Sequence, residues 1–319
     1  MSAFDLYVAA CDRNGGVFHY RVQEDGSARL LGSIALDRPM HMIEDGNSLA
    51  VLLFDSTGNG ESGLVCCPLL PDGCFGAPDA PIPTHGREAC HLSTLGGAIY
   101  VANYSSSSLI RLPNLLAERV GSGPHPRQRV AHPHYIAPTP DGRYLAAVDL
   151  GTDEIVLYHP DLTPHASLSL PAGSGPRHLA WHADGRHVFC VCELASTVSV
   201  LTYEDGVLTL GKTVSTLPCD ASVENIAAAI RCVGDTVYAT NRGHDSVAVL
   251  DFDGNTLTPR AHLPVHGSYP RDLLAVGDLL LCANEREGGV TVVSQSDGSL
   301  LARLPLPHPV CLVARGISE

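Results

Sequence analysis

PHYIAPTPDGRYLAAVDLGTDEIVLY, residues 133–158, is the stretch that decides the fold of this chain. It begins with a short apolar segment, turns at Asp-Gly-Arg, continues with a second apolar segment, turns again over polar residues and ends in a third segment. Short strands bounded by Gly and Asp turns have this pattern. The stretch PRHLAWHADGRHVFCVCELASTVSVL, residues 176–201, repeats it 43 residues later. The two copies predict a repeated unit of short antiparallel strands.

The same unit recurs along the chain, clearly from residues 89, 224 and 270 and more weakly from residues 5 and 40. One polar residue closes the second strand of each copy, and these residues stand 43 to 48 positions apart: Asp12, Asp55, Asn103, Asp149, Glu193, Asn241 and Asn284. A period of this size is what a blade of four antiparallel strands needs. No 3.6-residue pattern supports a helical solenoid. The sequence therefore predicts an all-β, seven-bladed β-propeller.

The two ends of the chain predict how the ring closes. The N-terminal segment DLYVAAC (residues 5–11) matches a second strand, whereas HPVCLVARG (residues 308–316) matches a first strand without its partner. A C-terminal strand that completes the N-terminal blade would join the first blade to the last and remove an open sheet edge. We therefore expect one propeller domain spanning residues 1–319.

Composition excludes several classes of partner. The formal net charge of −14 disfavours nucleic acid, whose binding depends on Lys and Arg. No apolar run approaches the length of a membrane span and no signal-like segment precedes the first strand, so we expect no membrane partner and a cytoplasmic location. The eleven cysteines lack framework spacing, and we favour reduced core thiols over disulfides.

The repeat geometry also predicts where a site lies. In a blade, the first strand starts at one mouth of the central channel and the second strand returns to that mouth. The polar residues that close the second strands should therefore lie close to the residues that start the first strands. These are Met40, Cys90, His134, Arg177, Asn225, Arg271 and Val310. Among both sets, His134, Glu193 and Arg177, with Arg242 after Asn241, combine a base, a carboxylate and two guanidinium groups. His suits proton transfer near neutral pH and Arg binds carboxylate or phosphate bidentately, so this set predicts a site for a small anion.

Structural roles compete with the functional ones. Glu193 could instead accept hydrogen bonds from its polar turn. Arg177 and Arg242 could instead form ion pairs with Glu193 between blades, and such pairs do not exclude a catalytic role. Asp149, before Leu-Gly-Thr-Asp, has more the character of a turn cap than of a catalytic group. His132 and His134 stand two apart, but no third ligand completes a metal set, so no metal is expected.

Several segments resemble the lactonase family of seven-bladed propellers, which includes propeller-type 6-phosphogluconolactonase and 3-carboxy-cis,cis-muconate lactonizing enzyme. They are CHL and YVANY within residues 90–104, RQ and HPH within 127–134, PDGRYLAAVDLGTD, GPRHLAWHADGRHVFCVCELASTVSV and ATNRGHDSVAV. The resemblance covers essentially the whole chain and implies a channel-mouth site made by His134, Arg177, Glu193 and Arg242. It also suggests Arg271, in YPRD, as an anion-binding residue. The sequence departs from the family in CEL where NEL is usual, and its first two blades match poorly.

The implied activity is hydrolysis of a small anionic sugar-type lactone without a cofactor. Arg177 and Arg242 would hold the anion and stabilise the oxyanion, while His134, or Glu193 if burial raises its pKa, would act as general base on water. Arg271, Asp149 and His132 are the expected substrate-binding residues. A carboxymuconate-type cycloisomerase, a metal-dependent sugar lactonase and a non-enzymatic binding platform remain alternatives, the last disfavoured by only 5% aromatic residues. We expect a monomer or weak homo-oligomer.

Overall fold

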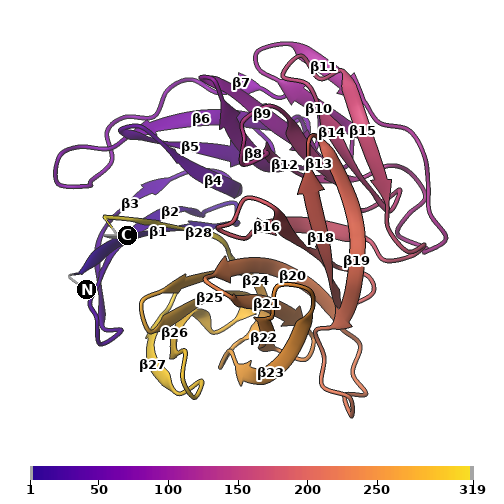
Figure 1. Cartoon of the computed structure of the whole chain (residues 1–319). Helices are drawn as coiled ribbons and strands as arrows, with labels where there is room; N and C mark the ends of the chain where they lie inside the picture. The colour runs from indigo at the N-terminus through magenta and orange to yellow at the C-terminus, as the bar shows by residue number, and fades with distance from the viewer. Residues whose placement is uncertain (1–2, 317–319) are drawn as a thin grey trace.

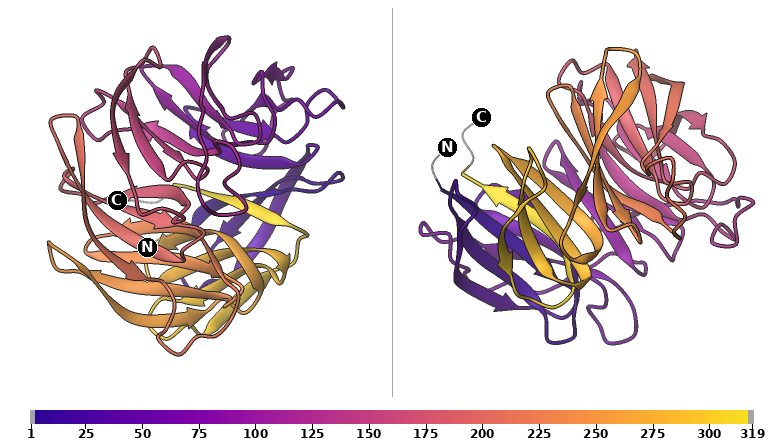
Figure 2. Two further views of the ribbon diagram at one scale, coloured as in Figure 1. Left: turned by 90° about the vertical axis from the view of Figure 1, so that its right-hand side faces the viewer. Right: turned by 90° about the horizontal axis from the view of Figure 1, so that it is seen from below.

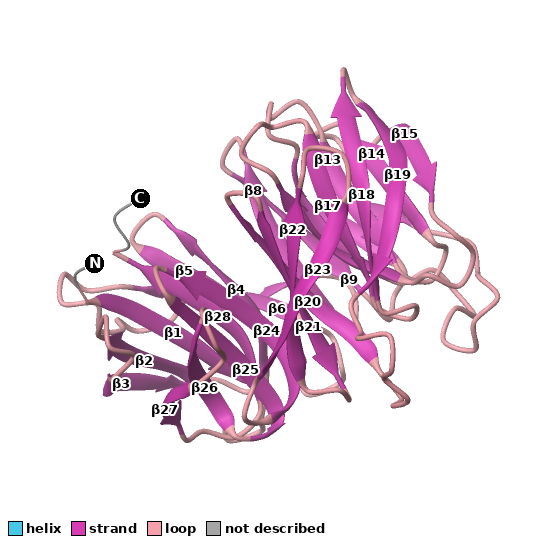
Figure 3. Cartoon of the chain, turned by 60° about the horizontal axis from the view of Figure 1, so that its bottom comes forward, coloured by secondary structure: helices cyan, strands magenta, loops and turns pink. Residues whose placement is uncertain are grey.

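The computed structural model describes residues 3–316, and these form seven four-stranded antiparallel sheets arranged as the blades of a propeller (Figure 1). Strands and loops account for all the described residues, with no helix among them (Figure 3). The prediction of an all-β, seven-bladed propeller is confirmed. Since the described part of the chain is built from strands, it contains no helix that is long and apolar enough to cross a membrane.

Blades are numbered here in chain order. Blade 1 contains β1 (Phe4–Ala10), β2 (Gly16–Val22), β3 (Ala28–Ala35) and β28 (Pro309–Arg315). Blade 2 contains β4 (Pro39–Asp45), β5 (Ser48–Leu53), β6 (Gly63–Pro68) and β7 (Ile82–Pro83). Blade 3 contains β8 (Ala89–Leu95), β9 (Ala98–Asn103), β10 (Ser108–Arg111) and β11 (Leu115–Glu118). Blade 4 contains β12 (Pro133–Pro138), β13 (Leu145–Asp149), β14 (Glu154–Tyr158) and β15 (Pro164–Ser169).

Blade 5 contains β16 (Pro176–Trp181), β17 (His187–Cys192), β18 (Thr197–Glu204) and β19 (Val207–Ser215). Blade 6 contains β20 (Ile226–Val233), β21 (Thr236–Arg242), β22 (Ser246–Phe252) and β23 (Leu257–Pro264). Blade 7 contains β24 (Ser268–Val276), β25 (Leu279–Glu287), β26 (Gly289–Ser294) and β27 (Leu300–Leu304).

The ring is closed by β28, which pairs antiparallel with β1 from Asp5 opposite Arg315 to Ala10 opposite Pro309. Figure 2 shows the two ends of the chain on the same side of the molecule. This confirms that the C-terminal strand completes the N-terminal blade. Residues 1–2 and 317–319 of the expected domain lie outside the described residues.

Seven apolar clusters hold the blades together, one at each interface between neighbours. At the interface of blades 4 and 5, for example, Val148 and Ile155 pack with Val188 and Leu201, all fully buried. The inner strands are nearly continuous apolar runs because both faces of each blade are covered by a neighbour. The eleven cysteines are free; six of them are buried as core residues, whereas Cys219 is exposed.

A β-bulge near the start of each first strand positions the channel-facing residues. In six blades the ladder skips one residue, and the skipped residues are Met40, Cys90, His134, Arg177, Arg271 and Val310. In blade 6 the irregularity falls at Ala228 and Ala229. A bulge redirects a side chain and recurs beside active sites. Six of the seven expected channel positions are therefore bulge residues, whereas Asn225 precedes β20 and hydrogen-bonds to Ser196 and Asn241.

The predicted ends of the second strands differ from the observed register in three blades. Glu193 lies one residue, and Asp12 and Asp55 lie two residues, beyond the position that Asn103 holds in blade 3. Four of the predicted residues pair with the residue just before the bulge of the first strand: Asn103, Asp149, Asn241 and Asn284. In blade 5 the residue that pairs there is Cys192. Glu193 is the next residue. Because side chains alternate along a strand, one residue separates a side chain inside the blade from one facing the channel. The predicted polar set therefore mixes different positions of the repeat.

Candidate functional site

The central channel has a cavity of about 380 Å³ at the mouth where the bulges lie, which we call the charged chamber. It is lined by Cys11, Arg38, Met40, Phe54, Glu88, Cys90, Tyr104, Arg127, His134, Glu193, Arg242, Arg271 and Glu285. Bulge residues and the residues that follow Asn103, Cys192, Asn241 and Asn284 supply most of this lining. Its volume lies within the range of small-molecule sites.

Glu193 is the centre of the charged chamber. The residue is 2% exposed, and its carboxylate forms ion pairs with Nη1 of Arg127 (2.6 Å), Nη2 of Arg242 (2.7 Å) and Nε of Arg177 (3.1 Å). Its backbone N–H donates to the carbonyl of Gly175 (2.6 Å), which holds the end of β17 in place. Three guanidinium groups from three segments of the chain thus converge on one carboxylate.

The main chain of blade 6 holds two of these arginines. Nη1 of Arg177 donates to the carbonyl of Ala228 (2.8 Å), and Nη2 of Arg242 donates to the carbonyl of Ala227 (3.0 Å). These carbonyls face the channel because the β20 ladder is irregular there. Both arginines pair with Glu193 as expected, but only the pair with Arg242 joins blade 5 to blade 6, because Arg177 and Glu193 belong to the same blade. Arg177 reaches blade 6 through the carbonyl of Ala228 instead.

The arginines control the protonation of Glu193. Burial by itself would raise the pKa of this carboxyl, but Arg242, Arg177 and Arg127 outweigh burial and lower the pKa well below its usual range. The condition for Glu193 to act as a base, a pKa raised by burial, is therefore not met. Burial, followed by the charge of Arg242, lowers the pKa of Arg177 to about 9, so this guanidinium still carries its charge at neutral pH.

His134 lies in the β12 bulge and is 6% exposed. Its ring makes an edge contact with Tyr104, at 5.5 Å between centroids. Among the described residues its Nδ1 has no hydrogen-bond partner. Burial, reinforced by the charge of Arg177, lowers the pKa of His134 well below its ordinary value. The imidazole is consequently neutral at pH 7 and able to accept a proton.

The other charged groups of the chamber are paired less tightly. Arg271, one of the expected substrate-binding residues, contacts both carboxylate oxygens of Glu285 at 3.1 and 3.2 Å. Arg38 pairs with Asp37 (3.1 Å) and Asp55 (3.4 Å), and its side chain is about one quarter exposed. These cations face solvent-accessible space, where an incoming anion would compete for them.

The two thiols of the charged chamber are not nucleophiles at neutral pH. Burial raises the pKa of Cys90 to about 12 and that of Cys11 to about 11. Because the thiolate is the reactive form, both cysteines act here as small apolar side chains.

Three predicted residues lie outside the lining of the charged chamber. Arg177 contacts Glu193 from the side of the bulge residues that faces away from the charged chamber. Oδ1 of Asp149 accepts hydrogen bonds from the backbone N–H groups of His132, Gly151 and Thr152, and its Oδ2 pairs with Arg119. His132 stacks on Tyr104 and bonds to the carbonyl of that residue through Nδ1 (3.0 Å). Asp149 has the geometry of a turn cap, and His132 acts on the chamber only through Tyr104.

Sequence reasoning did not single out Arg127, Tyr104, Glu285 or Arg38. Arg127 comes from the long connection between β11 and β12, outside the repeat, and its only signal was its place within the RQ and HPH segment. Tyr104 and Glu285 are one residue beyond the polar positions that were used to align the copies. A one-residue change of register would have found both of them.

A second cavity of about 600 Å³ lies on the other side of the bulge residues, and we call it the histidine chamber. Met40, Cys90 and Arg271 line both chambers, whereas Arg177 lines only this one. His41, His91 and His178 form a column here, with ring centroids 4.4 Å apart for the first pair and 5.3 Å for the second. Burial lowers the pKa of all three, that of His41 to about 4, so the column is neutral.

Comparison with known proteins identifies relatives over most of the chain. Residues 76–314 match the model of a family described as lactonase, 7-bladed beta-propeller. An uncharacterized protein of Staphylococcus epidermidis is 33% identical over 228 residues, a match that covers 69% of this chain and 66% of that protein. The chain thus spans about two thirds of the length of this curated relative.

Two solved structures are similar over nearly their full length. A candidate 6-phosphogluconolactonase from Bacteroides fragilis is 26% identical, with a TM-score of 0.86 and coverage of 98% of each chain. The periplasmic gluconolactonase of Pseudomonas aeruginosa is 25% identical, with a TM-score of 0.88 and coverage of 99% of this chain and 100% of that one.

Proposed function

Because the chain belongs to the lactonase family of seven-bladed β-propellers, we propose that it hydrolyses a small anionic lactone of the sugar-acid type. 6-Phosphogluconolactone is the first substrate to test. The observation that carries the proposal is the charged chamber, in which four arginines and one neutral, buried histidine surround a cavity of small-ligand size. Most of the side chains that line this mouth are charged. A protein-binding platform would present aromatic and apolar anchor residues there, so the lining argues against such a platform.

In the proposed mechanism, Arg127, Arg242 and Arg271 bind the anionic group of the substrate. Guanidinium groups donate in a planar fork that matches phosphate and carboxylate, and in a partly buried site their charge is screened less than in water. Glu193 is a positioning residue in this scheme, because it fixes Arg127 and Arg242 in one geometry before the substrate arrives.

His134 is the proposed general base. It takes a proton from water as the hydroxyl oxygen adds to the carbonyl carbon, and it returns this proton to the ring oxygen as the carbon–oxygen bond breaks. The open-chain acid then loses its carboxyl proton to solvent. The scheme needs no cofactor, and the neutral form of His134 at pH 7 makes the first transfer possible.

The test is acid release by the purified protein above the spontaneous rate, with 6-phosphogluconolactone, neutral gluconolactone and a muconolactone, each with and without chelator. We expect hydrolysis of the phosphorylated lactone that is unaffected by chelator, and a loss of about 10²- to 10⁴-fold in kcat with His134→Ala. Absence of turnover with every lactone, in protein that keeps its cooperative unfolding, would refute the proposal. Full turnover by His134→Ala would refute the assignment of the base.

Arg127→Ala separates anion binding from catalysis. Loss of a charged hydrogen bond worth about 1.5–3 kcal/mol should lower kcat/KM for the phosphorylated lactone about 10- to 100-fold and leave the neutral lactone nearly unchanged. Arg260→Ala is the matched control, since Arg260 is 53% exposed and pairs only with Asp251 among the ion pairs found in residues 3–316. Equal losses for both lactones would contradict the role given to Arg127.

A further inference from the structure

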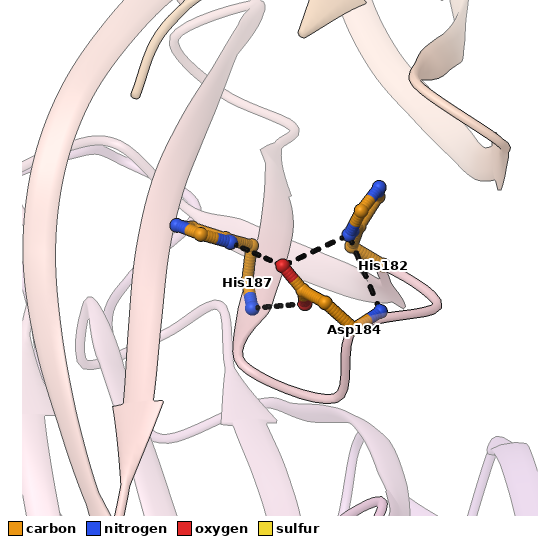
Figure 4. A group of neighbouring side chains, drawn as sticks. All are labelled: His182, Asp184 and His187. Carbon is orange, nitrogen blue, oxygen red and sulfur yellow. Dashed lines mark hydrogen bonds and ion pairs between the residues drawn. The ribbon is translucent and has the colours of Figure 1, made fainter. Parts of the chain in front are cut away.

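The hairpin between β16 and β17 brings three side chains with metal-ligating atoms together (Figure 4). Oδ2 of Asp184 lies 3.1 Å from Nδ1 of His182 and 2.6 Å from Nδ1 of His187. The potential ligand atoms of the three residues all lie within 4.8 Å of one another, and no other such group exists within residues 3–316. Two imidazole nitrogens and a carboxylate oxygen form a common ligand set for Zn²⁺ in proteins.

The equivalent hairpin of blade 4 shows which part of this arrangement the turn itself requires. There Thr139, Asp141 and Tyr144 occupy the three positions, and Oδ1 of Asp141 accepts the N–H of Arg143 at 3.1 Å. In blade 5, Oδ1 of Asp184 does the same for Arg186 (2.8 Å) and for His187 (2.9 Å). The capping oxygen is therefore Oδ1 in both blades, while the histidines of blade 5 face the other oxygen. Thr139 also donates to its turn carboxylate, from Oγ1 to Oδ1 of Asp141 (2.6 Å), so the turn accommodates a polar residue at the His182 position but does not require histidine at either position.

The hydrogen bonds of His182 define its tautomer. Its Nε2 lies 3.1 Å from Oδ1 of Asp235, in the β20–β21 turn of blade 6, and donates to this carboxylate. The backbone N–H of Asp184 points to Nδ1 of His182 at 3.3 Å, which makes Nδ1 an acceptor. The lone pair of Nδ1 therefore faces Oδ2 of Asp184. Two acceptors at 3.1 Å repel unless a proton or a metal ion lies between them, and a divalent ion serves here as well as a proton does.

The surroundings fix the two rings and leave one side open. Phe252 packs edge-on against both imidazoles, at 5.6 Å from His182 and 4.9 Å from His187. The side chains of the two histidines are 15% and 16% exposed, whereas that of Asp184 is 37% exposed. An ion can therefore enter from solvent into a group whose rings are already oriented.

We propose that His182, Asp184 and His187 bind a divalent transition-metal ion of the Zn²⁺ class through Nδ1, Oδ2 and Nδ1, with the fourth position open to solvent. A tetrahedral ion at 2.0–2.1 Å from its ligands needs ligand atoms about 3.3 Å apart. The 3.1 Å between His182 and Asp184 is close to this, whereas Nδ1 of His187, which hydrogen-bonds to Oδ2 of Asp184 at 2.6 Å, must move outward by about 0.7 Å to admit the ion. Asp235 orients His182 through Nε2–H, which is the usual carboxylate partner of a ligating histidine. The ion thereby links the hairpins of blades 5 and 6.

The site lies at the hairpin end of β16 and β17, whereas Arg177 and Glu193 lie at the opposite end of the same strands. The proposed ion is for this reason independent of lactone hydrolysis. Failure of either proposal leaves the other untouched, because the metal is tested by binding and the lactonase by acid release.

The experiment is calorimetric titration of ZnCl₂ into full-length, metal-stripped protein, with Cys219→Ser in every variant because Cys219 is exposed and free. The decisive variants, His182→Thr and His187→Tyr, install the blade 4 residues and so keep the turn. We expect one equivalent bound by the parent, at least about 100-fold weaker binding by each variant and about 10- to 100-fold weaker binding by Asp235→Asn.

A second readout is thermal stability. Saturating Zn²⁺ should raise the Tm of the parent and leave that of the His182→Thr, His187→Tyr double variant unchanged, since only a folded-state site transfers binding energy to stability. Thr139→Ala in blade 4 is the matched hairpin control and should bind like the parent. Undiminished binding by the double variant, or no measurable binding by the parent, would overturn the proposal.

Discussion

Replacing Glu193 with Gln removes one negative charge from between three arginines and keeps the shape of the side chain. The side chain of Arg127 is 42% exposed, so water can solvate its charge once the pair is lost. Those of Arg177 and Arg242 are 4% and 5% exposed and would remain buried, charged and mutually repelling. Removing one partner of a buried pair typically costs about 3–5 kcal/mol, and we expect Glu193→Gln to lower the free energy of unfolding by this amount.

The expected change in Tm follows from chain length. Unfolding entropy of about 2.1 cal/mol/K per residue gives about 0.67 kcal/mol/K for 319 residues. A loss of about 3–5 kcal/mol therefore lowers the Tm by about 4–8 °C. Urea unfolding followed by circular dichroism, together with calorimetry, measures both quantities on the same protein.

Two controls identify the cause of the destabilisation. Arg127→Ala removes a half-exposed partner and should cost less than about 1 kcal/mol. Inorganic phosphate should raise the Tm of Glu193→Gln more than that of the parent, because an anion can replace the missing carboxylate among the arginines. If Glu193→Gln unfolds within 1 °C of the parent and phosphate acts equally on both, the carboxylate does not hold the cluster together.

Three further predictions concern protonation and packing. Since burial lowers the pKa of His134 and the general base must be neutral, kcat/KM should be constant from pH 8 to about 6.5 and should fall only at lower pH. A pH–rate profile with its midpoint above pH 7 would contradict the assignment of His134 as the base. The pKa of His41 is about 4 in the folded protein and 6.5 in the unfolded chain, so below pH 6.5 the unfolded chain takes up the proton first and the free energy of unfolding falls by about 3 kcal/mol by pH 4. His41→Asn should flatten this part of the pH profile measured by urea unfolding. An unchanged slope would show that His41 is not the cause. Asp149→Ala leaves three backbone N–H groups without their acceptor and should lower the free energy of unfolding by about 2 kcal/mol with no change in KM. A tenfold higher KM at an unchanged Tm would instead show that Asp149 binds substrate.

The fold was predictable because the evidence for it is repeated. Each blade encodes the same order of apolar strands and turns, so an ambiguous copy such as residues 5–20 is supported by six others. The unpaired strand-like segment at residues 308–316 added the closure, since a lone strand in a propeller has one place to pair.

The candidate site was predictable only in part. His134, Arg242 and Glu193 stand out by residue type, and the structure places all three on the charged chamber. The ring of polar strand ends did not converge as expected, because the amides of Asn103, Asn241 and Asn284 turn into their blades. There they donate to hydroxyl groups of the third strand, those of Ser108, Ser246 and Thr291. A bulge is invisible in a sequence pattern, and with a side-chain period of two it decides which of two adjacent residues faces the channel.

By itself the sequence determined the number of blades, their closure by the C-terminal strand and the kinds of charged group at one mouth, because these depend on local pattern and on repetition. Only the tertiary structure decided that Arg127 reaches Glu193 from a connection outside the repeat, and that Arg177 approaches it from the histidine chamber. The protonation of Glu193 was likewise decided there. Burial and three nearby cations shift its pKa in opposite directions, and which of them prevails depends on distances that exist only in the folded chain.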